Sequence, residues 1–158
     1  MKHKSENYDN EISKISSAIT SKQNDINTKQ SLLQRENDLY SLISSYDIKI
    51  DNIKEKIQKH KEDIQNLNVS NKLMESEITQ IEIKLPALEE EKKGFVQTKN
   101  FKEAGRVSHE LKASLEKKSK NQQLIEQNKK NIELYQIELN EFENSITELN
   151  NEKKEHEK

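Results

Sequence analysis

The sequence predicts a reversal of the chain within GFVQTKNFKEAG (residues 94–105), because this stretch holds both glycines and a short polar break at residues 99–101. Apolar residues on the two sides of the break mirror one another. The numbers of each mirrored pair add up to 199 or 200: Leu88 with Leu111, Leu85 with Leu115, Met74 with Ile125, Leu67 with Ile132, Ile57 with Phe142, Ile53 with Ile146 and Ile50 with Leu149. The predicted fold is therefore all-α, a long antiparallel coiled-coil hairpin.

The composition excludes a wide hydrophobic core. Of 158 residues, 30% are hydrophobic, 35% are charged and 4% are aromatic, and tryptophan is absent. Two glycines and one proline also leave little material for turns or sheet corners. Such a chain is either disordered or packs thin helical stripes against one another, and the sustained apolar periodicity favours the second.

Two arms of the hairpin follow from the heptad spacing, a first arm over residues 43–98 and a second over 102–158, with a tip turn at 99–101. In the first arm the predicted contact positions are Ile43, Tyr46, Ile50, Ile53, Ile57, His60, Ile64, Leu67, Asn71, Met74, Ile78, Ile81, Leu85, Leu88, Lys92 and Phe95. In the second arm they are Ala104, Val107, Leu111, Leu115, Lys118, Gln122, Ile125, Lys129, Ile132, Tyr135, Leu139, Phe142, Ile146 and Leu149. The polar residues in the middle of the second arm predict a weak seam there.

Residues 1–42 form a segment with its own heptad pattern, which predicts an extra N-terminal helix. The pattern comprises Tyr8, Ile12, Ile15, Ile19, Lys22, Ile26, Lys29 and Leu33. Its phase changes between Leu32 and Tyr46, which either overwinds a continuous helix or marks a bend. The segment then folds back as a third helix or extends as an overhang, and an overhang with an unpaired apolar stripe favours self-association through residues 1–42.

Three local signals concern the region around the tip. Pro86 lacks a backbone N–H and either kinks the first arm or begins a new helix, and the acidic residues 89–91 favour a new beginning. Asn100 is a candidate N-cap of the second arm, with Glu103 at capping-box spacing. Gly94 and Gly105 mirror each other, which predicts a close approach of the two helices at that point.

The tip, FKEAGRVSHELK (residues 101–112), resembles the UVR motif, a short helical hairpin of bacterial excision-repair proteins that also occurs in unrelated adaptors. The family pattern is approximately F-E-x-A-A-R-L-R-D-E-I-K, and the resemblance extends over about residues 86–115. The matching positions are Phe101, Ala104, Arg106, Glu110 and Lys112, with conservative matches at Val107 and Leu111 and departures at Gly105, Ser108 and His109. The resemblance implies a protein-protein contact without activity of its own.

The candidate protein-binding residues are Phe101, Lys102, Arg106 and His109, all at this tip. An aromatic residue near an arginine is typical of a small interface hot spot. Alternatively, Phe101 folds back on Phe95 and Ala104 and only closes the hairpin.

We expect neither catalysis nor a cofactor. The chain has no cysteine, no phosphate-binding loop and no paired carboxylates that a two-helix fold could desolvate. The four histidines, His3, His60, His109 and His156, share no metal-ligand spacing. A net charge of −2 with interspersed signs disfavours nucleic acid as a partner. No apolar run reaches the roughly 20 residues of a membrane span, and we expect a cytoplasmic protein.

Two functions remain open at this level. The first is a noncatalytic coiled-coil scaffold or spacer that mediates protein-protein interaction. The second is a UVR-like regulatory adaptor that recruits an enzyme or repair factor through the hairpin tip, principally through Phe101 and Arg106.

Overall fold

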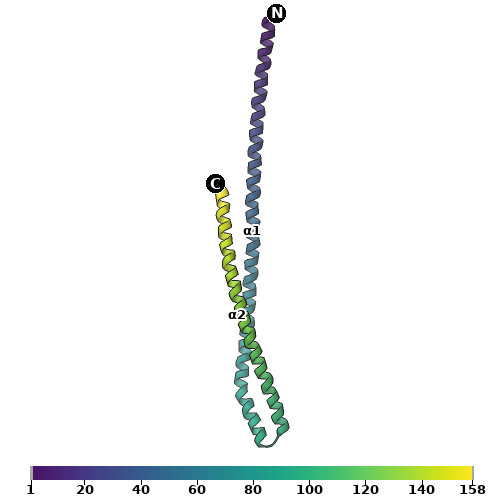
Figure 1. The fold of residues 1–158 in the computed structure, drawn as a ribbon, viewed down its shortest axis with the longest axis vertical. Coiled ribbons are helices and arrows are strands. Elements are labelled where there is room, and N and C mark those ends of the chain that lie inside the picture. The colour runs from purple at the N-terminus through teal and green to yellow at the C-terminus, as the bar shows by residue number, and fades with distance from the viewer. Residues whose placement is uncertain (1, 158) are drawn as a thin grey trace. The chain divides into compact units, whose positions relative to one another are not determined.

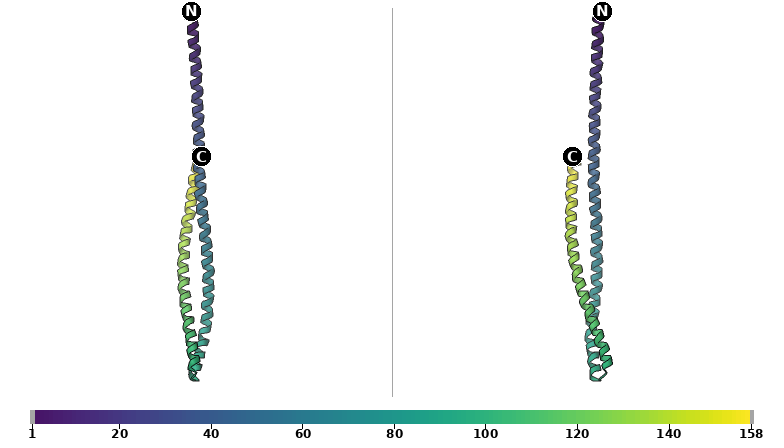
Figure 2. Two further views of the ribbon diagram at one scale, coloured as in Figure 1. Left: turned by 90° about the vertical axis from the view of Figure 1, so that its right-hand side faces the viewer. Right: turned by 45° about the vertical axis from the view of Figure 1, so that its right-hand side comes forward.

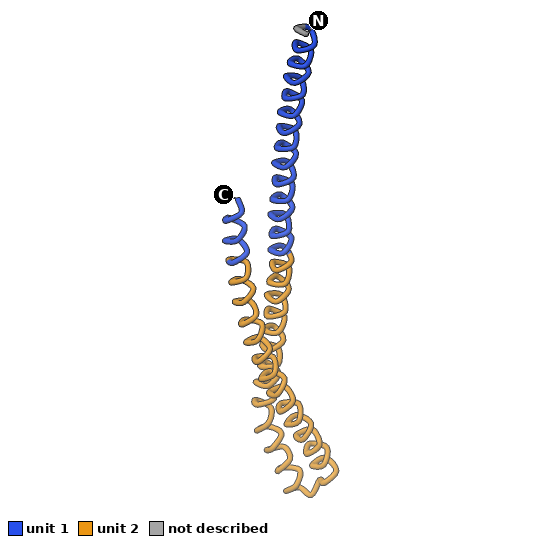
Figure 3. Tube along the Cα trace, turned by 45° about the horizontal axis from the view of Figure 1, so that its top comes forward, with its two compact units in different colours: residues 1–51, 148–158 blue, residues 52–147 orange. Residues whose placement is uncertain are grey.

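The protein consists of two helices over the described residues 2–157 of a computed structural model (Figure 1). Helix α1 spans Lys2–Gln97 and helix α2 spans Phe101–Glu157, and residues 98–100 connect them. The predicted helical hairpin is thereby confirmed. The chain divides into two units, residues 1–51 with 148–158 (unit 1) and residues 52–147 (unit 2), which Figure 3 distinguishes by colour.

Unit 2 contains the turn and the two helical segments on either side of it, which lie side by side in both views of Figure 2. Along α1 in this unit, each predicted contact position is buried or partly buried. These positions are Ile53, Ile57, His60, Ile64, Leu67, Asn71, Met74, Ile78, Ile81, Leu85, Leu88, Lys92 and Phe95. The heptad periodicity therefore located this side of the seam correctly.

Along α2 the prediction was wrong at three positions, because Leu115, Gln122 and Lys129 are exposed. The neighbouring Ser114, Asn121 and Asn128 are buried or partly buried instead. The seam of α2 in unit 2 is therefore Ala104, Val107, Leu111, Ser114, Lys118, Asn121, Ile125, Asn128, Ile132, Tyr135, Leu139, Phe142 and Ile146. Its steps alternate between three and four residues without a slip, as a heptad repeat requires.

Polar side chains fix the register of the two helices in unit 2. The Asn128 Nδ2 group donates a hydrogen bond to Asn71 Oδ1 at 2.8 Å, and these two residue numbers have the predicted sum of 199. The Asn121 Nδ2 group donates to Glu77 Oε2, also at 2.8 Å. Asn71 and Asn121 are 6% and 7% exposed, so a slip would leave buried amides without these partners.

His60 occupies a contact position between two aromatic rings, as an edge contact to Tyr135 and to Phe142 with ring centroids 4.8 and 5.3 Å apart. Its Nε2 atom pairs with the carboxylate of Glu138. The imidazole thus forms a polar layer within the seam, and its apolar faces pack as an aromatic residue would.

Two expectations near the tip were wrong. Helix α1 continues through Pro86 to Gln97, so no new helix begins at the proline. A Cβ atom built on Gly94 or on Gly105 would meet no atom within 4 Å, so the glycines do not mark a close approach of the helices.

Unit 1 contains the first part of α1 and the last part of α2. Residues 2–51 are uninterrupted helix, so the phase change between Leu32 and Tyr46 does not end α1, and residues 2–42 do not fold back as a third helix.

The last residues of α1 in unit 1 contact α2. Ile50 is 6% exposed, and Lys153 Nζ lies 2.7 Å from Asp47 Oδ1. Tyr46 stacks on His156 at 5.8 Å between ring centroids. Residues 4–42, in contrast, are all exposed.

Within residues 2–157, neither helix has a segment of sufficient length and apolarity to cross a membrane.

Candidate functional site

The tip turn closes α1 with a Schellman motif, whose left-handed residue is Lys99 at φ 59°. The backbone N–H of Asn100 donates to the Phe95 carbonyl at 2.8 Å, and that of Lys99 donates to the Val96 carbonyl at 3.1 Å. These bonds satisfy carbonyls that the helix end would otherwise leave unpaired. The turn is therefore well defined, although the position that normally holds glycine carries a lysine.

Asn100 caps α2 as predicted. Its Oδ1 atom accepts a hydrogen bond from the Glu103 backbone N–H at 3.4 Å, and its carbonyl accepts one from Ala104 at 3.1 Å. The return bond of a capping box is not formed, because the N–H of Asn100 is already bound to Phe95. The Glu103 carboxylate instead accepts a hydrogen bond from Arg106 Nε at 2.8 Å.

Phe101 is the first residue of α2 and its side chain is exposed, at 65% of its maximal accessible area. A phenylalanine that closed the hairpin by packing on Phe95 and Ala104 would be largely shielded from solvent. The fold-back alternative is therefore wrong, and an aromatic ring is available at the tip.

Arg106 is engaged within the chain. Besides Glu103, it lies 3.7 Å from Glu91 of α1 and 3.7 Å from Glu110 of α2. The hydrogen bond and charge of Glu103, followed by the charges of Glu91 and Glu110, raise the pKa of Arg106 above its ordinary value. Such exposed ion pairs contribute little to stability, yet a partner that binds Arg106 must offer better acceptors than three carboxylates.

The other two predicted tip residues, Lys102 and His109, are exposed on α2. The structure thus places all four candidates within the first turns of one helix, where the sequence predicted them. Their role in binding stays a prediction.

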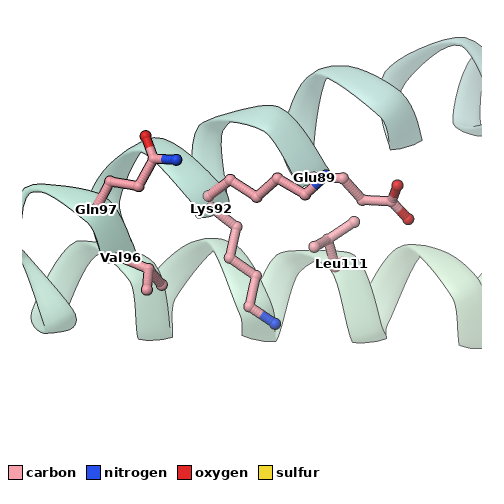
Figure 4. A pocket seen from close by; sticks show the side chains of 6 residues that line it. Glu89, Lys92, Val96, Gln97 and Leu111 are labelled. Atoms are coloured by element: carbon pink, nitrogen blue, oxygen red, sulfur yellow. The ribbon is translucent and has the colours of Figure 1, made fainter.

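A groove of about 500 Å³ lies beside the tip, between α1 and α2 (Figure 4). Its lining combines buried Leu111 with Val96, which is 46% exposed, and a rim of Glu89, Lys92, Lys93 and Gln97. Leu115, which is 51% exposed, lines the continuation of this groove. The sequence prediction placed Leu115 inside the seam and therefore missed its exposed side chain in this continuation.

A second candidate surface is the apolar stripe of α1 in unit 1, here called the N-terminal stripe. It comprises Tyr8, Ile12, Ile15, Ile19, Ile26 and Leu33, with Lys22 and Lys29 at the intervening heptad positions. The six apolar side chains are 47–64% exposed, and no residue from 4 to 42 is buried. Exposed apolar residues in such a regular row are typical of an interaction surface.

Among the described residues, no group of three or more histidine, aspartate and glutamate side chains could hold a metal ion. His3 lies outside the part of the chain whose side chains are described.

Comparison with protein-family models, with curated proteins and with solved structures finds no match to this chain.

Proposed function

We propose that this protein is a noncatalytic scaffold that mediates protein-protein interaction through the N-terminal stripe. The observation that carries this proposal is the contrast along α1. Contact positions of α1 from Ile43 to Phe95 are buried or partly buried, while the heptad positions from Tyr8 to Leu33, which are also mostly apolar, are exposed among the described residues. A helical stripe of that length contributes little to stability until a second surface removes it from water.

The packing of the hairpin supports this role. Its two helices pair as an antiparallel coiled coil in the register that the asparagine and histidine layers define. The side chains of the stripe do not take part in this packing, so they stay available for binding.

The second candidate function is a UVR-like adaptor that recruits an enzyme or repair factor through the tip. The exposed ring of Phe101 favours it. The engagement of Arg106 with Glu91, Glu103 and Glu110 makes the tip a weaker site than its composition alone suggests.

Affinity capture from an extract of the source cells separates the two. The immobilised intact chain is compared with a stripe variant that changes Ile12, Ile15, Ile19 and Ile26 to Gln, since glutamine removes the apolar surface but keeps good helix propensity. The matched control changes Leu134 and Ile137 to Gln, two equally exposed apolar residues (58% and 56%) outside the stripe. The tip variant carries Phe101→Ala with Arg106→Glu.

We expect the stripe variant to lose the captured proteins, while the control and tip variants keep them. Loss in the tip variant alone, with the helicity and thermal midpoint of the chain unchanged, would favour the adaptor. Equal capture by all variants, or no capture by the intact chain together with no self-association, would refute the scaffold proposal.

A further inference from the structure

The N-terminal stripe has the features of one half of a coiled coil. From Tyr8 to Leu33 it extends over nearly four heptads, which is the length at which a heptad pattern becomes a strong sign of helix pairing. The described part of the structure gives Lys22, Lys29 and Glu11 no ion pair within the chain. A partner must therefore supply an apolar seam that accommodates two lysines.

A second copy of the stripe supplies such a seam, provided that the two helices are antiparallel. In a parallel, in-register pair, Lys22 would lie opposite Lys22 and Lys29 opposite Lys29, which places like charges in the seam. In an antiparallel pair, each a position of one helix lies opposite a d position of the other helix. Each lysine then lies opposite an isoleucine, over which its methylene chain can extend while its ammonium group reaches water.

One antiparallel register covers the stripe completely. It places Tyr8 opposite Leu33, Ile12 opposite Lys29, Ile15 opposite Ile26 and Ile19 opposite Lys22. Because Glu11 precedes Ile12, this register also brings the Glu11 carboxylate next to the Lys29 ammonium of the other copy. A shift by one heptad in one direction would instead place Glu36 opposite Ile12 and next to Glu11, where two carboxylates repel each other. A shift in the other direction would leave Lys29 and Leu33 without an opposite residue of the stripe.

We infer that the N-terminal stripe binds a second copy of this chain as an antiparallel two-helix coiled coil in that register. This inference rests on the proposed role of the stripe as the interaction surface. It specifies the partner, the orientation and the charge pair between Glu11 and Lys29.

Cysteine crosslinking tests the orientation without background, because the chain has no cysteine of its own. Chains carrying Ile15→Cys are mixed with chains carrying Ile26→Cys and oxidised. We expect disulfide-linked dimers in the mixture and few in either chain alone. A control chain carrying Ser17→Cys, on the opposite face of the helix, gives the level of chance collisions. Dimers of the Ile15→Cys chain alone would overturn the inference in favour of parallel pairing.

A charge swap tests the register. Sedimentation equilibrium of Glu11→Lys and of Lys29→Glu should give dimer dissociation constants about three- to tenfold higher than that of the parent chain, and the double variant should restore the parent value. In a parallel pair these two residues lie more than two heptads apart, so the double variant would not be restored. Additive loss in the double variant therefore refutes this register.

The outcomes distinguish this inference from the proposed function. A chain that stays monomeric at all concentrations but still needs the stripe to capture another protein would refute the second-copy inference and leave the scaffold role intact. A chain that dimerises equally well with the stripe changed to glutamines, and whose capture of other proteins is also unchanged, would refute both.

Discussion

At the scale of single residues, the tip differs most from what its composition suggests. The two glycines lie inside regular helix with open space where their Cβ atoms would be, and the left-handed position between the helices belongs to Lys99. Glycine is usually placed where the backbone needs a positive φ. Here both glycines lie within helices, where their conformational freedom only destabilises the helix.

Lys99→Gly should therefore stabilise the hairpin. A side chain at a left-handed φ costs about 1–2 kcal/mol, and the greater freedom of glycine in the unfolded chain offsets part of the gain, so we expect a net increase of about 0.5–1 kcal/mol. Urea unfolding measures this change. Lys99→Ala is the matched control, since it removes the same side chain but keeps the Cβ atom and should bring no such gain. An unchanged or lower free energy of unfolding for Lys99→Gly would contradict the turn geometry.

Gly94→Ala and Gly105→Ala should each raise the free energy of unfolding by about 0.5–1 kcal/mol, because alanine is the better helix former and its methyl group meets no atom. The thermal midpoint of each single variant provides the measurement. If the glycines lay in close contact across the seam, as the sequence first suggested, both variants would be destabilised.

At the scale of helices, the sequence predicted α1 better than α2, and the reason lies in the polar layers. In α1 apolar residues occupy most contact positions, so the heptad frame could be followed from Ile53 to Phe95. In α2 the step of three after Leu111 leads to Ser114, whereas a step of four leads to the apolar Leu115. Choosing the more hydrophobic residue reversed the order of the three- and four-residue steps up to Ile132, so that Leu115, Gln122 and Lys129 were each predicted one residue too late.

The tip geometry could be predicted only in part. Asn100 carries a recognisable capping signal, but nothing in the residue type of Lys99 indicates a positive φ. The ion pair of Arg106 with Glu91 joins residues from different helices, so it depends on the register and could not be read from the spacing within one helix.

The pair of Asn71 and Asn128 should behave as one energetic unit. Asn128→Leu leaves the buried Asn71 oxygen without its donor and should cost about 1–3 kcal/mol, while the double variant Asn71→Leu with Asn128→Leu should recover the loss or exceed the parent stability. A double-mutant cycle from chemical denaturation measures the coupling. Asn140→Leu, at an exposed position, serves as the control. Additive effects of the two single changes would show that the amides do not interact.

At the scale of the whole molecule, one chain presents two kinds of helical surface. The contact positions from Ile43 to Phe95 are buried or partly buried, whereas the side chains of the N-terminal stripe have the same periodicity and are exposed in the described part of the chain. Periodicity predicted both surfaces. It could not distinguish a covered stripe from an exposed one, because both have the same spacing of apolar residues and the difference depends on which residues of α1 pack against α2.

Hydrogen exchange of backbone amides in a solution dilute enough for the chain to be monomeric tests this contrast most directly. Amides of residues 8–33 open without breaking tertiary packing, so we predict that they exchange orders of magnitude faster than those of residues 53–95. Protection of residues 8–33 equal to that of residues 53–95 in the dilute monomer would mean that the stripe already has a partner inside the chain, which would contradict its role as a surface kept free for binding.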